Sequence, residues 1–200
     1  MHEYGPGTAL IVVDVQNDFA DPEGSLSVPG AEEAVAAANR EIAAASQAGA
    51  TVVATQDWHP ERTPHFVTDG GPWPVHCVAG TWGADLSPGL ALPEAAPRVR
   101  KGANGEDGYS GFTMRDPQTG QTTPTELEGI LRDAGVEAVA VIGLATDYCV
   151  KASALDAVRL GFRTTILTDA VAAVDLRPGD GDRALEELRE AGVALEGSRQ

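Results

Sequence analysis

Segments with the composition of helices alternate along the chain with runs of β-forming residues. Four segments are predicted to be helices, and each stops directly before a glycine: residues 31–48, 125–134, 148–160 and 183–191, followed by Gly49, Gly135, Gly161 and Gly192. Glycine readily adopts the left-handed backbone conformation that ends a helix, so these glycines mark the helix termini. A β-rich run follows each of them.

Six runs are predicted to be strands: residues 8–13, 50–55, 97–101, 136–143, 162–169 and 193–196. The first of these, TALIVV, is continuously apolar up to Asp14, which is typical of a strand covered on both faces. Helices alternating with buried strands favour the α/β class, as a doubly wound, mostly parallel six-stranded sheet with helices on both faces, a Rossmann-like three-layer arrangement. We expect a single domain over residues 1–200.

Chemically capable residues follow four of these strands at their carboxyl ends. Asp14 ends the first strand, Asp57 closely follows the second, Lys101 ends the third and Cys149 lies just past the fourth. Ligands of open parallel sheets bind beyond the carboxyl ends of the strands. The fold is therefore expected to bring these four side chains together on one rim.

The charge of the chain limits its partners. Thirty acidic residues against 14 Lys and Arg give a formal net charge of −16. Binding to phosphate needs concentrated positive charge, so we expect no nucleic acid and no anionic membrane surface as partner. No apolar run approaches the roughly 18 residues of a membrane span, and the first residues lack the pattern of a secretion signal. A small, uncharged or cationic molecule fits this balance better.

Cysteine usage points in the same direction. Cys77 and Cys149 could form at most one disulfide, which is no structural framework and suits a reducing, cytoplasmic location. With Thr146 as N-cap, Cys149 would lie in the first turn of a helix, where unpaired amides and the helix dipole favour a thiolate. A buried structural cysteine is the alternative. The expected proximity of Asp14 and Lys101 favours a nucleophile instead.

Asp14 and Lys101 would assist such a nucleophile. A carboxylate at the end of a buried strand is costly unless it is paired, and Asp14 could remove the thiol proton and return it to a leaving amine. Lys101 would stabilise both charged partners. Alone, Asp14 could equally be a turn or capping residue, and Lys101 a solvated loop residue.

A cluster of histidines indicates a metal site. Asp57 and His59 lie two residues apart, and His65 and His76 follow within the same short region. One carboxylate with two or three imidazoles suits one divalent ion, zinc, iron or manganese. Histidines in a loop can also be ordinary surface residues. The glycine-rich segment GANGEDGYSG lacks the spacings of phosphate-binding loops and contains two acidic residues, so no nucleotide cofactor is expected.

Taken together, the segments ALIVVDVQNDF, DWHP, WPVHCV, KGANGEDGYSGF and GLATDYCV resemble the nicotinamidase/pyrazinamidase branch of the isochorismatase-like cysteine hydrolases. The resemblance covers nearly the whole chain, and DWHP with WPVHCV is its most specific part. It implies a catalytic triad formed by Asp14, Lys101 and Cys149. It also implies the metal ligands Asp57, His59 and His76, with His65 as a ligand in only some members.

The resemblance further implies an oxyanion hole formed by the backbone N–H groups of Ala145 and Cys149, next to a cis Leu144–Ala145 peptide. The residues that it implies as walls around a pyridine ring are Phe19, Trp73 and Tyr109.

The resemblance also implies an activity. We expect hydrolysis of nicotinamide to nicotinate and ammonia through a cysteine thioester, as a step of NAD salvage. Pyrazinamide is expected as a further substrate. A homo-oligomer is compatible with the resemblance. The alternatives are another isochorismatase-like hydrolase, such as an isochorismatase or an N-carbamoyl amidase, and, from a different class, a metal or redox sensor using both cysteines. The stretch from Thr119 to Pro124 is expected to be a surface loop.

Overall fold

The computed structural model describes residues 2–197, so residue 1 and residues 198–200 of the expected domain lie outside the described part. Its centre is a six-stranded sheet with the strand order β3-β2-β1-β6-β7-β8, in which every neighbouring pair runs parallel. The predicted fold class is therefore confirmed. The strands are β1 (Thr8–Val13), β2 (Thr51–Asp57), β3 (Arg98–Lys101), β6 (Ala138–Leu144), β7 (Arg163–Ala172) and β8 (Ala194–Glu196).

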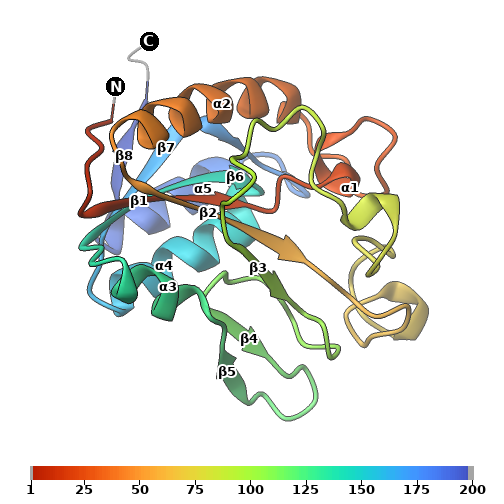
Figure 1. The fold of residues 1–200 in the computed structure, drawn as a ribbon. Coiled ribbons are helices and arrows are strands. Elements are labelled where there is room, and N and C mark those ends of the chain that lie inside the picture. Colours follow the sequence, from red (N-terminus) through yellow and green to blue (C-terminus); the bar gives the residue numbers. More distant parts are fainter. Residues whose placement is uncertain (1, 198–200) are drawn as a thin grey trace.

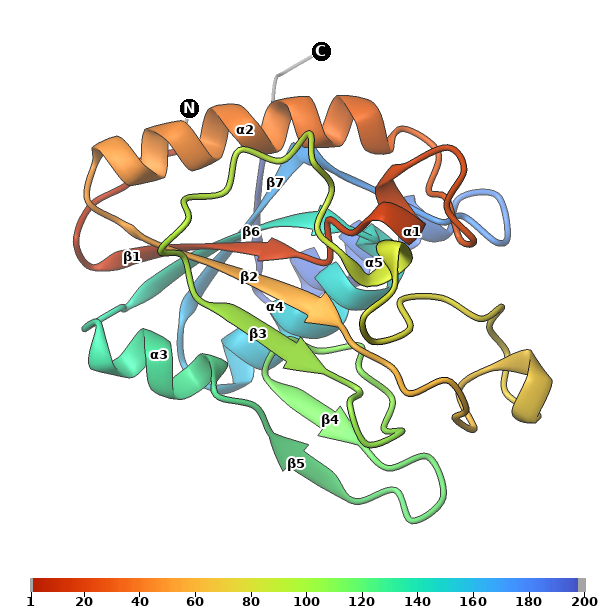
Figure 2. The same ribbon diagram turned by 45° about the vertical axis from the view of Figure 1, so that its right-hand side comes forward.

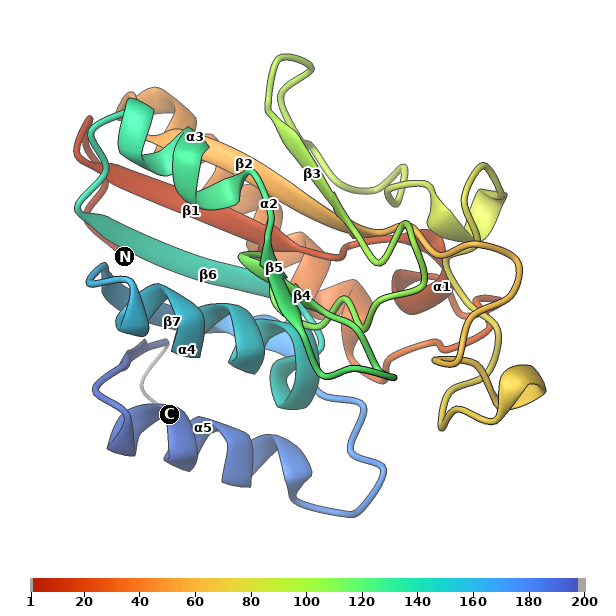
Figure 3. The ribbon, with the colours of Figure 1, turned by 90° about the horizontal axis from the view of Figure 1, so that it is seen from below.

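Helices cover both faces of the sheet (Figure 1). The long helix α2 (Ala31–Gln47) lies on one face, and α3 (Leu127–Asp133), α4 (Lys151–Arg159) and α5 (Asp180–Glu190) lie on the other. Figure 3, which views the molecule from below, shows α4 and α5 running side by side on the face of the sheet turned toward the viewer. The three layers follow from the need of a parallel sheet to bury both of its faces.

The side chains of β1 explain why this run is apolar throughout. Leu10 and Val12 belong to the hydrophobic core under α2, whereas Ile11 and Val13 belong to the core under the other helices. All four are completely buried. Successive side chains of a strand point to opposite faces, and each buried aliphatic side chain stabilises the fold by about 1.5–3 kcal/mol. The strand therefore holds the two cores together.

Several smaller elements were not predicted. Strands β4 (Thr113–Arg115) and β5 (Thr122–Pro124) form a two-stranded antiparallel hairpin that protrudes from the molecule (Figure 2). The expected surface loop from Thr119 to Pro124 is thus wrong in part, because its second half is exposed but is a strand. Short helices also appear in the loops: α1 (Asn17–Ala20), η1 (Val67–Asp69) and η2 (Trp82–Ala84), with the single turn η3 (Thr146–Val150) before α4.

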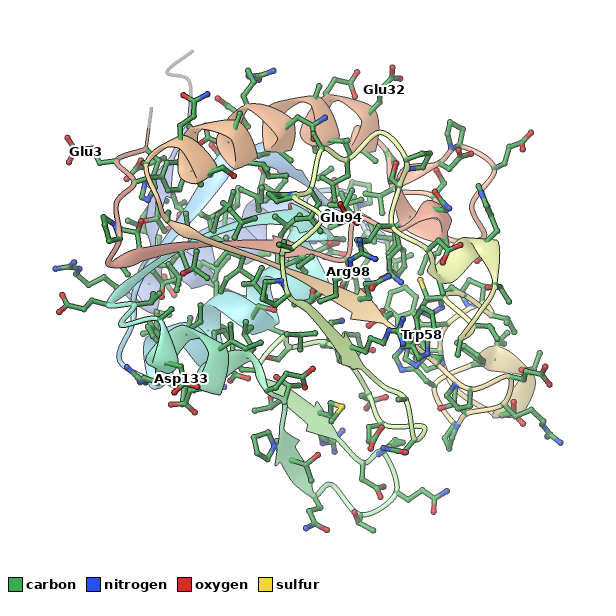
Figure 4. The ribbon with its side chains drawn as sticks, viewed as in Figure 1. Glu3, Glu32, Trp58, Glu94, Arg98 and Asp133 are labelled. Carbon is green, nitrogen blue, oxygen red and sulfur yellow. The ribbon has the colours of Figure 1, made fainter. Side chains whose placement is uncertain are left out.

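The long connections gather at the carboxyl ends of β1, β2 and β3 (Figure 2). They include the segment of residues 58–97 between β2 and β3. The side chains of Glu3, Glu32 and Asp133 project outward from different sides of the molecule (Figure 4). Among residues 2–197, no helix combines the length and apolar character that crossing a bilayer would require.

Candidate active site

Three of the predicted site residues meet at the rim formed by the carboxyl ends of the strands. Asp14 directly follows β1, Lys101 is the last residue of β3, and Cys149 lies in the turn after β6. The Lys101 ammonium Nζ lies 2.7 Å from the Asp14 Oδ2 atom and 3.8 Å from the Cys149 Sγ atom. Asp14 and Cys149 themselves lie within 4.8 Å of each other, measured between carboxylate oxygen and sulfur. Residues far apart in the sequence thus share one small space.

Burial makes the charges of this group strongly interdependent. Asp14 and Lys101 are completely buried. Burial raises the pKa of Asp14 to about 6, against the lowering effect of Lys101. Burial would lower the pKa of Lys101, but the carboxylates of Asp14 and Asp57 outweigh it and raise this pKa well above its ordinary value. The lysine is therefore a permanent cation, and Asp14 is a carboxylate that can exchange a proton near neutral pH.

The structure corrects the expected helix cap beside Cys149 and shows how burial acts on its thiol. Burial, together with the carboxylates of Asp14 and Asp57, raises the pKa of Cys149 well above its ordinary value, although Lys101 opposes this. Burial thus favours the thiol over the thiolate, in keeping with the expectation that Asp14 removes the thiol proton. Thr146 is not the N-cap, because the N-cap residue of the turn is Ala145 and it makes no side-chain capping bond.

Asp57 connects this group to the histidine cluster. Its Oδ1 atom accepts a hydrogen bond from the Lys101 ammonium. Its Oδ2 atom lies 3.8 Å from the His59 Nε2 atom and 3.9 Å from the His76 Nε2 atom. Burial alone would raise the pKa of Asp57, but Lys101 and His59 outweigh it and hold the pKa well below its usual range. The carboxylate is therefore charged and faces two ring nitrogens.

The three histidines are arranged as ligands of a metal ion. Ring nitrogens of His59, His65 and His76 lie within 4.8 Å of one another, and all three side chains are buried. Burial lowers the pKa of His76 to about 4 and also lowers that of His65, so both rings are neutral at pH 7. Both ring nitrogens of His59 are buried without a hydrogen-bond partner. Such orphaned atoms are costly unless something binds them, and three imidazoles with one carboxylate suit a divalent metal.

A pocket opens beside both groups. The predicted ring-binding residues Phe19, Trp73 and Tyr109 line it, and the Trp73 indole donates a hydrogen bond of 2.7 Å to the Tyr109 hydroxyl. Ala145 and Cys149 also line it, and the Leu144–Ala145 peptide is cis, as expected. The mostly apolar, aromatic walls are those of a site for a small aromatic molecule.

Sequence reasoning missed some of the pocket walls. Leu26, Tyr148 and Val174 also line the space, and the Tyr148 ring packs edge-on against Trp73 with 4.7 Å between ring centroids. Tyr148 directly precedes Cys149 in the turn after β6, and this position beside the expected nucleophile was the signal that could have identified it. Leu26 and Val174 belong to loops that reach the pocket only through tertiary packing.

Comparison with known proteins identifies the family of this site. The family model described as "Isochorismatase domain" matches residues 8–200. The chain belongs to the isochorismatase family. Within it, the chain is 43% identical to a nicotinamidase/pyrazinamidase of Mycobacterium tuberculosis, over 94% of this chain and 97% of the relative.

Solved structures of isochorismatase-family relatives share the whole fold. A pyrazinamidase of Pyrococcus horikoshii in complex with zinc is 42% identical to this chain and superimposes on it with a TM-score of 0.85. The match covers 96% of this chain and 100% of the relative. PnC1 from L. infantum, in complex with nicotinate, is 39% identical with a TM-score of 0.88, covering 98% of this chain and 96% of the relative.

Proposed function

We propose that the protein is a metal-dependent nicotinamidase that hydrolyses nicotinamide to nicotinate and ammonia, with Cys149 as nucleophile. One observation carries the proposal: the Lys101 ammonium lies 2.7 Å from Asp14 and 3.8 Å from the Cys149 sulfur, beside a pocket that also contains the histidine cluster. The relatives that bear the names nicotinamidase and pyrazinamidase support the same activity.

Asp57, His59, His65 and His76 are the residues that would hold a divalent cation. When bound, this cation supplies a Lewis-acidic position for the ring nitrogen of the substrate and so orients the ring. The zinc in the pyrazinamidase of Pyrococcus horikoshii supports zinc as the ion, while iron and manganese suit the same donor set.

The pocket walls would position the substrate. Phe19, Trp73 and Tyr109 offer aromatic surface to a flat pyridine ring, and Tyr148 closes the same space. Holding the ring in this way places its carboxamide carbon over the Cys149 sulfur. Such positioning converts the attack into an effectively intramolecular step, which contributes several kcal/mol to catalysis.

The charges of the triad then define the acylation step. Asp14 removes the proton from the Cys149 thiol, and the resulting thiolate is stabilised by the Lys101 ammonium at 3.8 Å. The sulfur attacks the carboxamide carbon, and the backbone N–H groups of Ala145 and Cys149 donate hydrogen bonds to the oxyanion. Asp14 returns its proton to the leaving nitrogen, the C–N bond breaks, and ammonia departs from a thioester on Cys149.

Hydrolysis of the thioester uses the same groups in reverse. Asp14, again a carboxylate, takes a proton from a water molecule that attacks the thioester carbon. The C–S bond breaks, the proton passes to the sulfur, and nicotinate leaves. The permanent positive charge of Lys101 holds Asp14 ionised between the two half-reactions.

The same pocket would accept pyrazinamide, because a pyrazine ring has the same shape as pyridine and presents a nitrogen at the same position. The product nicotinate would enter NAD salvage. We propose a cytoplasmic location, which the two unpaired cysteines Cys77 and Cys149 support, since the reaction requires a free thiol.

Ammonia and nicotinate release by the purified, zinc-loaded protein tests the proposal. Nicotinamide should be hydrolysed, pyrazinamide should follow, and isochorismate and N-carbamoylsarcosine should be left unchanged. Preferential turnover of either of the last two compounds would overturn the assignment in favour of another branch of the family.

A further inference from the structure

Two loops meet over the histidine cluster through three side-chain hydrogen bonds. The first loop follows β2 and carries Thr63, His65 and Trp73, and the second follows β3. Thr63 Oγ1 donates to the Gly105 carbonyl (3.1 Å), and the Trp73 indole donates to Tyr109 (2.7 Å). Between these two links, the His65 Nδ1 atom lies 2.9 Å from the Asp107 Oδ1 atom.

The contact with Asp107 determines how His65 presents its other nitrogen. An ionised carboxylate can only accept hydrogen bonds, so the Nδ1 atom of His65 must carry the proton. In the neutral ring this leaves the lone pair on Nε2, and His65 stacks on the His59 ring with 4.9 Å between centroids. A ligand imidazole commonly has its tautomer and orientation fixed in this way by an outer carboxylate.

Asp107 is itself held in place by the hairpin. Its backbone N–H donates to the Arg115 carbonyl (2.7 Å), and the Arg115 N–H donates back to the Asp107 carbonyl (3.2 Å). The second carboxylate oxygen, Oδ2, faces the Arg115 guanidinium at 3.6 Å. The two oxygens of Asp107 thus have separate partners, a histidine on one side and an arginine of β4 on the other.

His76, a second histidine of the cluster, has a backbone carbonyl rather than a carboxylate as its hydrogen-bond partner. His76 Nδ1 lies 2.7 Å from the Pro74 carbonyl oxygen, which belongs to its own loop. The loop that carries His65 is instead oriented by a side chain from a different segment. The hydrogen-bond partner of the His65 ring is therefore the Asp107 carboxylate, in place of a carbonyl of its own loop.

We propose that Asp107 is a positioning residue of the metal site, which holds His65 in the orientation and tautomer that ligation requires. This inference rests on the proposed function only in assuming that the cluster binds a metal. Asp107 lies outside the ligand set and the triad, and it couples the protruding hairpin to the affinity of the site for the ion.

Zinc affinity of the purified full-length protein, measured by competition with a chromophoric chelator, tests this proposal. Asp107→Ala should weaken zinc binding by about 10–100-fold. Asp107→Asn, whose amide oxygen can still accept from Nδ1, should lose less. Asp69→Asn is the matched control. It removes a carboxylate from the loop that carries His65, and this carboxylate pairs with Arg62 and not with a histidine of the cluster. It should bind zinc like the wild type.

A second measurement separates positioning from general stability. The Tm of the metal-free Asp107→Asn variant should equal that of the metal-free wild type, while the Tm increase caused by zinc should shrink. Equal zinc affinities of Asp107→Ala and Asp69→Asn would overturn the proposal. If Asp107→Ala does not fold, Asp107→Leu, which also lacks an acceptor for the His65 Nδ1 atom, takes its place, and an unchanged zinc affinity of that variant together with an unchanged zinc-induced Tm increase would overturn the proposal. A wild type that binds zinc but releases no ammonia from nicotinamide would refute the proposed function and leave this comparison intact.

Discussion

The hydroxyl of Thr55 affects the proton affinity of Asp14, the proposed general base. Thr55 is a completely buried residue of β2, and its Oγ1 atom donates a hydrogen bond of 2.7 Å to the Asp14 Oδ1 atom. This bond stabilises the ionised form of Asp14 and so lowers its pKa. Thr55→Val removes the donor and retains the branched shape. The variant should therefore raise the pKa of Asp14.

The size of this effect can be estimated. A hydrogen bond to a charged group contributes about 1.5–3 kcal/mol, and one pKa unit corresponds to about 1.4 kcal/mol. Loss of the bond should thus raise the pKa of Asp14 from about 6 by about one to two units. Asp14 acts as a base only when ionised, so activity is present above this pKa and is lost as the pH falls through it. At pH 7 the variant should be about 2- to 10-fold slower.

The assay is the pH dependence of kcat/KM for nicotinamide between pH 5 and pH 9, which reports the pKa of the free enzyme. The acid limb should move to higher pH in Thr55→Val, and the rates of both proteins should converge at pH 9. Thr55→Ser keeps the hydroxyl and should leave the limb where it is. An unshifted acid limb in Thr55→Val, with activity lowered equally at every pH, would refute the role of Asp14 as base.

Three further variants test other parts of the account. His59→Ala should lower the metal content and raise KM for nicotinamide together, because both His59 nitrogens otherwise lack a partner; unchanged metal occupancy would remove His59 from the site. Gly71→Ala should destabilise the protein by about 1–3 kcal/mol and raise KM for nicotinamide. The reason is that a Cβ at this position would lie 2.2 Å from the Pro64 carbonyl oxygen, in the loop that carries Trp73. Denaturant unfolding measures the loss of stability, and steady-state kinetics measures KM. Gly129→Ala in α3, with no atom within 4 Å of the added Cβ, should instead stabilise by about 0.5–1 kcal/mol, and a loss of stability there would contradict the helix propensity argument.

The sequence pattern was sufficient for the sheet and for the meeting of the triad. The apolar run of β1 and the glycines after the helices determine the strand and helix order, and the parallel topology then forces Asp14, Lys101 and Cys149 onto one rim. These predictions succeed because the periodicity is a local property of the chain, and because parallel strands place all their carboxyl ends at the same edge of the sheet.

Other features depend on tertiary packing and were missed or wrong. The thiol state of Cys149 is set by burial and two neighbouring carboxylates, which a position at the start of a helical turn does not reveal. Asp107 reaches His65 only because a hairpin pairs with its backbone. The Thr122–Pro124 strand has no apolar alternation, because its residues are exposed. For Cys149 and for the pair of His65 and Asp107, the deciding interaction lies between segments distant in sequence.

The rate of ammonia release by Cys149→Ala, measured on zinc-loaded protein at saturating nicotinamide, tests the central claim most directly. Covalent catalysis predicts a fall in turnover of more than about 1,000-fold, while the variant still binds zinc and nicotinamide because the histidines and the aromatic walls are untouched. Substantial remaining turnover by this variant would contradict the account, since the thioester could then not form.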